Sequence, residues 1–265
     1  MARAHRRPWA LPALLAATVL GLLTGCATPQ AAYDPSRAHH RPDGFVNAHP
    51  SPHGNSEGGF WRWHWERWQT ELPPDRPERV ARQTPDLQQL KNPGHDLTVT
   101  WLGHSSALWQ VSGLNILVDP HFGPRASPVS FAGPRRLTPA PLGIDQLPRI
   151  DLVLISHNHY DHLDEGTVRA LSAQAGGSPL FMVPLGVDAW MAKVGIQRVQ
   201  RMDWWDRQDI AAPAGPVTVH FVPSHHWSSR TPWDRRATLW GGFVVQARVA
   251  GEPSSLYHAG DTGYA

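Results

Sequence analysis

The chemically most telling residues are three histidines and one aspartate at positions 157–162, in the order His-Asn-His-Tyr-Asp-His. Imidazole nitrogens and carboxylate oxygens suit zinc or a similar borderline metal. The absence of nearby cysteines argues against a structural site rich in cysteine. Alternate side chains of an extended segment point the same way, so His157 and His159 can converge on one cation. Asp161 and His162, at the turn that follows, can face a second cation. A histidine-rich surface tract is the alternative, but this cluster terminates an apolar strand, which favours a metal site.

Three strand-like runs are expected to deliver metal-binding side chains at their ends. Residues 151–155 lead directly into the cluster, residues 219–222 precede His226, and residues 256–259 precede Asp261. Ligand sites of α/β proteins gather at the C-terminal ends of strands. Taken alone, a single strand-end histidine or aspartate is usually a turn residue. The prediction of a metal site therefore rests on the three strand ends together.

Strand-like and helix-like runs alternate from residue 97 onward. This mixture predicts an α/β sandwich, and no internal repeat with a fixed period is present. The expected strands are 97–101, 106–111, 115–119, 151–155, 180–183, 217–222, 239–246 and 255–259, and the expected helices are 165–174 and 186–194.

These residues resemble the metallo-β-lactamase superfamily, and most closely its N-acyl-phosphatidylethanolamine phospholipase D family. The resemblance runs from about residue 97 to residue 265. It implies an α/β fold, the metallo-β-lactamase αββα sandwich, incomplete at the C-terminus. The matching stretches are 102–105 (Leu-Gly-His-Ser), 118–120 (Val-Asp-Pro), 125–128 (Arg-Ala-Ser-Pro), 133–134 (Gly-Pro), 155–164, 183–186 (Val-Pro-Leu-Gly), 203–205 (Asp-Trp-Trp), 226–227 (His-Trp) and 259–264 (Ala-Gly-Asp-Thr-Gly-Tyr).

The resemblance implies two zinc ions and a set of protein ligands in which one aspartate bridges both ions. His226 is preferred to its neighbour His225 because the family has a His-Trp pair. His104 and Asp119 are expected to orient ligands from behind, although a hydrogen-bonded core histidine is an equal alternative for His104. The implied ligands are His157, His159 and His226 for the first zinc, Asp161 and His162 for the second, and Asp261 for both.

The implied activity is a zinc-dependent hydrolase, a phospholipase D-type phosphodiesterase that acts on N-acyl-phosphatidylethanolamine-like phospholipids through a metal-bridging hydroxide. Asp161 and Asp261 are the candidate catalytic residues, because a carboxylate beside the metal can handle the proton of that water. A lactonase or esterase of the same fold is an alternative, since hydroxide attacks acyl carbon equally well. Members of the family supply a last histidine ligand to the second zinc further along, and no residue up to Ala265 can be assigned that role. A truncated member that only binds metal is therefore a third hypothesis.

The N-terminus predicts a bacterial lipoprotein. Residues 1–25 have a basic start and a short apolar run, as in a signal peptide. Cys26 closes a lipobox-like Leu-Thr-Gly-Cys, and as the only cysteine it rules out an internal disulfide. By resemblance to sorted lipoproteins, an alanine and not an aspartate after the cysteine, here Ala27, favours the outer membrane, facing the periplasm. Without the leader's arginines the chain is close to neutral, so we expect no positive electrostatic potential that would attract nucleic acid.

Two segments separate the leader from the domain expected at residues 97–265. Residues 26–58, rich in Pro, His, Ser and Asn, are interpreted as a flexible tether. Residues 59–96 contain a tryptophan stripe, which on a helix favours packing on or near the domain over a role at a membrane interface. The tether histidines, interpreted as solvated, are His39, His40, His49 and His53, and the tryptophans of the stripe are Trp61, Trp65 and Trp68.

Overall fold

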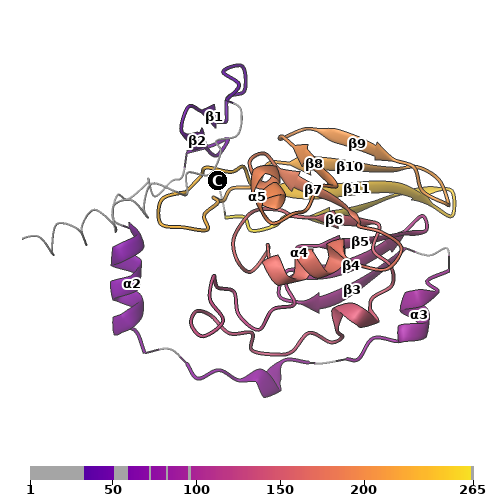
Figure 1. Ribbon diagram of the computed structural model, residues 1–265, viewed down its shortest axis with the longest axis horizontal. Helices are drawn as coiled ribbons and strands as arrows, with labels where there is room; N and C mark the ends of the chain where they lie inside the picture. Colours follow the sequence, from indigo (N-terminus) through magenta and orange to yellow (C-terminus); the bar gives the residue numbers. More distant parts are fainter. Residues whose placement is uncertain (1–32, 51–58, 72, 82, 95–96, 264–265) are drawn as a thin grey trace, which may run out of the picture.

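Two β-sheets lie face to face in the computed structural model, which describes residues 33–50, 59–71, 73–81, 83–94 and 97–263 (Figure 1). The larger sheet has the order β3-β4-β5-β6-β7-β8 and the smaller one β12-β11-β10-β9. The larger sheet contains β3 (Thr98–Gly103), β4 (Ser106–Val111), β5 (Leu114–Val118), β6 (Leu152–Leu154), β7 (Leu180–Pro184) and β8 (Val199–Met202). The smaller one contains β9 (Arg207–Ile210), β10 (Val217–Val222), β11 (Gly242–Val249) and β12 (Glu252–His258).

Strands β5 to β8 are parallel, whereas β3, β4 and β5 form an antiparallel meander. All three residues of β6 are buried, as expected for a parallel strand covered on both faces. Strand β10 instead alternates buried and half-buried residues, because only one of its faces meets the other sheet. The parallel arrangement brings the C-terminal ends of β5, β6 and β7 to one edge.

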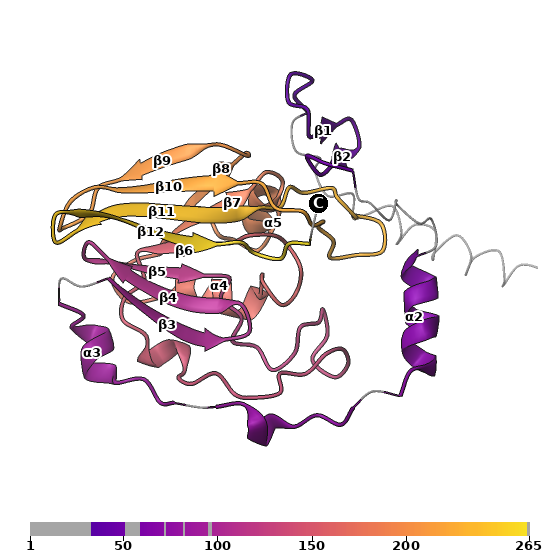
Figure 2. The same cartoon turned by 180° about the vertical axis from the view of Figure 1, so that it is seen from behind.

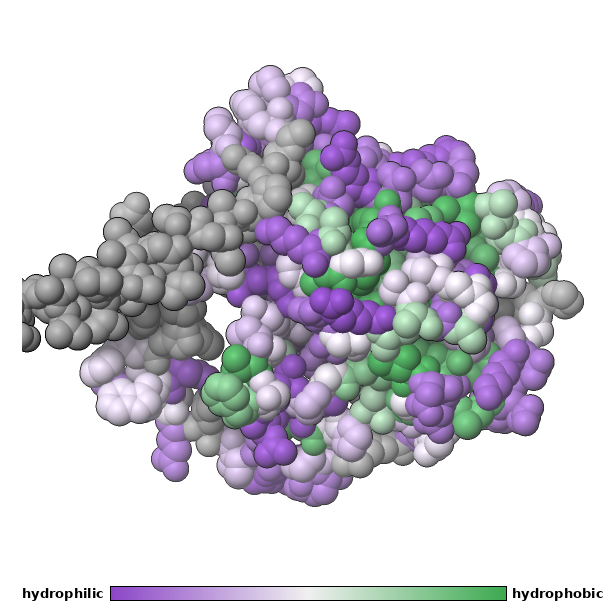
Figure 3. Space-filling view, viewed as in Figure 1, coloured by the Kyte–Doolittle hydropathy of each residue, from purple (hydrophilic) through white to green (hydrophobic). Residues whose placement is uncertain are grey.

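Helices α4 (Glu165–Ser172) and α5 (Val187–Lys193) cover the outer face of the larger sheet (Figure 1). Each turns apolar residues three or four positions apart into the core, Val168 and Leu171 in α4 and Val187 and Met191 in α5. Hydrophilic and hydrophobic residues are interspersed on the molecular surface seen from this side (Figure 3).

Two hydrophobic cores result, one between the sheets and one under the helices. The first contains Trp109, Ile116, Phe221 and Phe243, and the second contains Phe181 with the apolar faces of α4 and α5. The predicted α/β sandwich is thereby confirmed.

Several element boundaries differ from the sequence prediction. The strand expected from residue 239 begins at Gly242, because Leu239 and Trp240 are buried in the loop before it. Gly186 is the cap before α5, with a positive φ of 86°, and not its first residue. The mostly polar strands β8 and β9 were not anticipated, because polar edge residues give no hydrophobic signal.

The interpretation of His39 and His40 as solvated residues of a flexible tether was wrong. Strands β1 (His40–Arg41) and β2 (Gly44–Phe45) form a hairpin that pairs antiparallel. His39 and His40 are buried, with 8% and 3% of their surface exposed. Their Nε2 atoms lie 2.6 Å and 3.1 Å from the two carboxylate oxygens of Asp203. A buried carboxylate far along the chain supplies the partner, and local composition cannot show it.

The structure describes only part of the remaining tether and leader. His49 is exposed, and His53, Cys26 and residues 1–25 lie outside the described residues. Within the described part of the chain, we find no helix with the length and apolar character needed to cross a membrane.

The tryptophan stripe lies on α2 (Gly59–Gln69), and Figures 1 and 2 both show this helix apart from the two sheets. Trp65 and Trp68 contact each other at a ring separation of 5.3 Å but remain 58% and 77% exposed. The expected packing against the domain is therefore wrong for these two side chains. Two short helical segments follow along the chain, a 3-10 turn at Pro77–Arg79 and α3 (Leu87–Lys91); a second 3-10 turn lies at Ile144–Gln146.

Candidate metal centre

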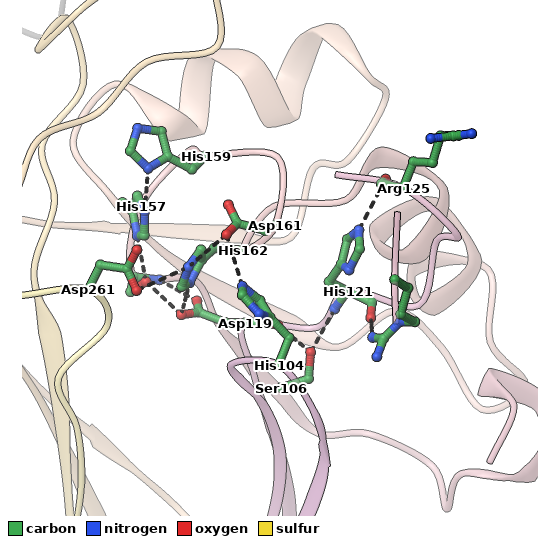
Figure 4. A network of polar contacts seen from close by, with 12 residues as sticks. His104, Ser106, Asp119, His121, Arg125, His157, His159, Asp161, His162 and Asp261 are labelled. Carbon is green, nitrogen blue, oxygen red and sulfur yellow. Dashed lines mark hydrogen bonds and ion pairs between the residues drawn. The ribbon is translucent and has the colours of Figure 1, made fainter. Parts of the chain in front are cut away.

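Three loops meet at the C-terminal edge of the strands, after β6, after β10 and after β12. The loop after β12 approaches the loop after β6 closely enough that only glycine fits at its start. Gly260 has a φ of 62°, and a Cβ there would lie 2.8 Å from the Cβ of Ser156. The backbone therefore places Asp261 beside the histidine cluster (Figure 4).

Four side chains direct ligand atoms to a first point in this centre. His159 Nδ1 lies 2.9 Å from His157 Nε2 and 3.3 Å from His226 Nε2. Asp261 Oδ2 lies 3.7 Å from His226 Nε2, and the four ligand atoms are all within 4.8 Å of one another. Two ligands of one tetrahedral zinc stand roughly 3.3 Å apart, from bond lengths of about 2 Å. The spacing of these atoms therefore fits a single cation.

A second group lies next to the first. His104 Nε2 is 2.9 Å from Asp161 Oδ2, and His162 Nε2 is 3.7 Å from the same oxygen. Asp261 turns its other oxygen, Oδ1, to within 3.3 Å of His162 Nε2. His162 Nε2 is fully buried and has no hydrogen-bond partner among the described residues. A buried polar atom needs such a partner, and a cation between these groups would supply one.

Burial keeps the histidines of the first group uncharged. It lowers the pKa of His157 well below its usual value and also lowers that of His159. For His226, burial together with His159 lowers the pKa to about 4. Neutral imidazole is the form that binds a metal ion. These three side chains are consequently ready to bind at neutral pH.

The carboxylates of the centre are ionised. The close approach of His162, whose Nε2 lies 3.3 Å from Oδ1, lowers the pKa of Asp261 to about 2. For Asp161, burial raises the pKa, but the hydrogen bond from His104 and the charge of His162 together outweigh it and bring the pKa below the ordinary range. Two negative charges thus stand beside three neutral imidazoles, an arrangement that attracts a dication.

Asp119 is fully buried directly after β5 and organises the rear of the centre. Its carboxylate accepts hydrogen bonds from Ser156 N (2.7 Å), Ser156 Oγ (2.6 Å), His162 Nδ1 (2.8 Å) and His258 Nε2 (2.6 Å). Burial raises the pKa of Asp119, but His258 and His162 outweigh it and hold the pKa well below its usual value. An ionised carboxylate only accepts, so His162 donates from Nδ1 and directs Nε2 into the centre.

His162 carries the proton that a metal ion would displace. Burial opposes its charge, but Asp119 and Asp261 outweigh this effect and raise the pKa of His162 to about 10. Metal binding at the second group therefore releases a proton from this side chain.

His104 lies at the edge of the centre and not in the core. Its side chain is 48% exposed, which excludes the alternative of a hydrogen-bonded core histidine. It reaches Asp161 from the turn between β3 and β4, in a backbone conformation with a φ of 51°. His225 does not join either group of ligand atoms, whereas His226 does.

Sequence reasoning missed several side chains that hold this centre. Arg230 donates from Nη1 to Asn158 O (2.9 Å) and Leu163 O (2.7 Å), which closes the loop of the histidine cluster. Its guanidinium also packs on the ring of Tyr160 at 4.0 Å. Ser156 and His258 both bind Asp119; Ser156 directly precedes His157 and His258 lies three residues before Asp261, and this proximity to predicted ligands was the signal available.

Residues 114–265 match the family model described as the beta-lactamase superfamily domain. An uncharacterized protein of Mycobacterium tuberculosis is 40% identical over 63% of this chain and 43% of its own length. The N-acyl-phosphatidylethanolamine-hydrolyzing phospholipase D 1 of Caenorhabditis elegans is 34% identical over 63% of this chain and 47% of its own length. A metal-dependent hydrolase of Methanopyrus kandleri is 28% identical over 63% of each chain. The chain thus spans about half the length of the first two relatives.

Proposed function

We propose, since this chain belongs to the beta-lactamase superfamily, that it is a metal-dependent hydrolase that cleaves a phospholipid phosphodiester in the manner of a phospholipase D. The observation that supports the proposal is the pair of adjacent ligand groups that share Asp261, whose two oxygens face His226 and His162. Two-metal centres with a shared carboxylate suit hydrolysis of phosphodiesters.

Zinc is the metal we propose, because the ligand groups offer only imidazole and carboxylate. When bound, such ions lower the pKa of water and neutralise charge on a phosphate. His157, His159 and His226 would hold the first ion, with Asp261 between the two. Asp161 and His162 would hold the second.

The chain's own residues then handle the proton and hold the ligand side chains in place. Asp161 and Asp261 are ionised and partly exposed, so either can accept a proton from a water molecule in the centre. His104, exposed at the edge, fixes the Asp161 carboxylate through its hydrogen bond. Asp119 keeps His162 in the tautomer that directs Nε2 inward.

We propose N-acyl-phosphatidylethanolamine as the substrate class, on the similarity to the Caenorhabditis elegans enzyme of that name. Water oxygen forms the new bond to phosphorus, and the bond from phosphorus to the ethanolamine oxygen breaks. The departing oxygen takes up a proton. The products are phosphatidic acid and an N-acylethanolamine.

We further propose that the protein is anchored in the bacterial envelope, at the outer membrane facing the periplasm, through a lipid on Cys26. The lipobox-like sequence that ends at Cys26 supports this. Metabolic labelling with a radioactive fatty acid should mark the wild-type chain and not Cys26→Ala. Equal labelling of both chains would contradict the anchor.

The test of activity uses the full chain loaded with zinc and vesicles that contain N-acyl-phosphatidylethanolamine, with phosphatidic acid measured by mass spectrometry. We expect turnover by the wild type and by Glu252→Gln, an exposed control on β12. Asp261→Ala should abolish it. Hydrolysis of a lactone or carboxylic ester without release of phosphatidic acid would overturn the substrate proposal in favour of the esterase alternative.

A further inference from the structure

The hairpin of β1 and β2 lies outside the matched family domain, which begins at residue 114, yet it contacts the loops of the metal centre. Phe45 N donates to Arg236 O at 3.0 Å. Gly44 has a φ of 144°, and a Cβ there would overlap Arg236 O. The hairpin backbone is therefore fitted closely against the loop between β10 and β11.

A buried clasp anchors the hairpin on the side of β8. His39 and His40 both bind the Asp203 carboxylate. The ring of His39 also stacks on Trp204 with the ring centroids 4.3 Å apart. His40 Nδ1 accepts a hydrogen bond from Asp34 N, so His40 Nε2 is the donor to Asp203. This clasp holds residues 39–47 in register with the domain.

The hairpin ends in a contact with a ligand of the centre. Asn47 Oδ1 accepts a hydrogen bond from His226 N at 3.1 Å and another from Trp240 Nε1 at 3.0 Å. Trp240 is buried and its carbonyl accepts a hydrogen bond from Trp204 Nε1. One side-chain oxygen thus ties the backbone of His226 to the clasp through a buried tryptophan.

We propose, on the basis of the metal-dependent activity proposed above, that Asn47 is a positioning residue for His226. By fixing the backbone of His226, Asn47 sets the distance of 3.3 Å between His226 Nε2 and His159 Nδ1 that a shared cation requires. The segment before the family domain is then part of the metal centre, although it supplies no ligand.

The test compares Asn47→Ala with Asn47→Asp, whose carboxylate retains an acceptor at the same place. Asp43→Ala, an exposed substitution in the turn of the same hairpin, is the matched control. Two measurements are made on the full chain: hydrogen exchange of the His226 amide without metal, and Zn²⁺ affinity by competition with a chromophoric chelator. Asn47→Ser serves in place of Asn47→Ala if the alanine variant does not fold.

We expect Asn47→Ala to accelerate exchange at His226 about tenfold, as for one lost hydrogen bond. Its Zn²⁺ affinity should fall about 10- to 100-fold, the usual effect of removing a group that orients a ligand. Asn47→Asp should restore both quantities, and Asp43→Ala should change neither.

Each other outcome shows which claim is wrong: the contact, the positioning role or the proposed function. Unchanged exchange at His226 in Asn47→Ala would overturn the contact itself, whatever the metal does. Faster exchange with unchanged Zn²⁺ affinity would overturn the positioning role and leave the proposed function standing. A wild-type chain that binds no Zn²⁺ would overturn the proposed function and the positioning role together, while the exchange measurement still reports on the contact.

Discussion

Asp119→Asn replaces a charged acceptor by an amide of nearly the same shape. In the wild type, Asp119 Oδ2 accepts from Ser156 Oγ, His162 Nδ1 and His258 Nε2, and Oδ1 accepts from Ser156 N. All the groups that face this carboxylate are donors. The amide NH₂ of asparagine would therefore point at a donor in either orientation, and one contact becomes repulsive.

Two effects of this substitution have separate magnitudes. Removing one partner of a buried charge network costs about 3–5 kcal/mol of unfolding free energy, because His162 loses the charge that compensates its own. Loss of the partner that orients His162 should weaken Zn²⁺ binding about 10- to 100-fold. The pKa of His162, about 10 in the wild type, should also fall, because Asp119 is the main group that raises it.

Urea unfolding of the metal-free protein measures the first effect, and chelator competition measures the second. Asp209→Asn, at an exposed ion pair on β9, is the control and should change neither quantity noticeably. If Asp119→Asn unfolds within about 0.5 kcal/mol of the wild type, well below the expected cost, and binds Zn²⁺ within twofold, the account of Asp119 is refuted.

Three further outcomes are expected. Arg230→Met should lower the Tm, because Asn158 O and Leu163 O lose their donor; an unchanged Tm in a thermal scan would contradict this role. Stability of the metal-free protein, measured by urea unfolding from pH 5 to 9, should peak near the ordinary histidine pKa of about 6.5. Toward pH 4, His226 becomes protonated in the unfolded chain but stays neutral in the folded protein, where its pKa is about 4, so stability falls. Toward pH 10, His162 loses its proton in the unfolded chain but keeps it in the folded protein, where its pKa is about 10, so stability falls again. A profile that rises steadily from pH 6.5 to 9 would count against the charged state of His162. Chelation with EDTA should lower the Tm of the zinc-loaded protein and added Zn²⁺ should restore it, whereas a Tm indifferent to both would speak against a metal centre.

The local parts of the centre could be predicted from the sequence. Spacing within residues 157–162 determines which side chains share a face, and the apolar run before them determines that a buried strand delivers them. The same holds for the mixed pattern that predicted an α/β sandwich. These features depend on neighbours a few residues apart, which periodicity encodes directly.

Contacts between distant segments could not be predicted in this way. The Asp119 carboxylate meets His258 across 139 residues, and Asn47 meets His226 across 179. The Pro- and His-rich composition of the hairpin suggested a solvated tether, and the buried Asp203 that holds it is invisible locally. Likewise, an amphipathic tryptophan stripe indicates that one face of a helix is apolar, but it does not indicate which part of the protein, if any, covers that face.

The sequence by itself determined which residue types stand at the ends of the strands and therefore what chemistry they can perform. Only the tertiary structure decided which ends meet, because sheet order and loop paths set the distances between side chains far apart in the chain. Metal binding depends on those distances to within a few tenths of an ångström, and the buried carboxylate of Asp119 and the close approach at Gly260 fix them.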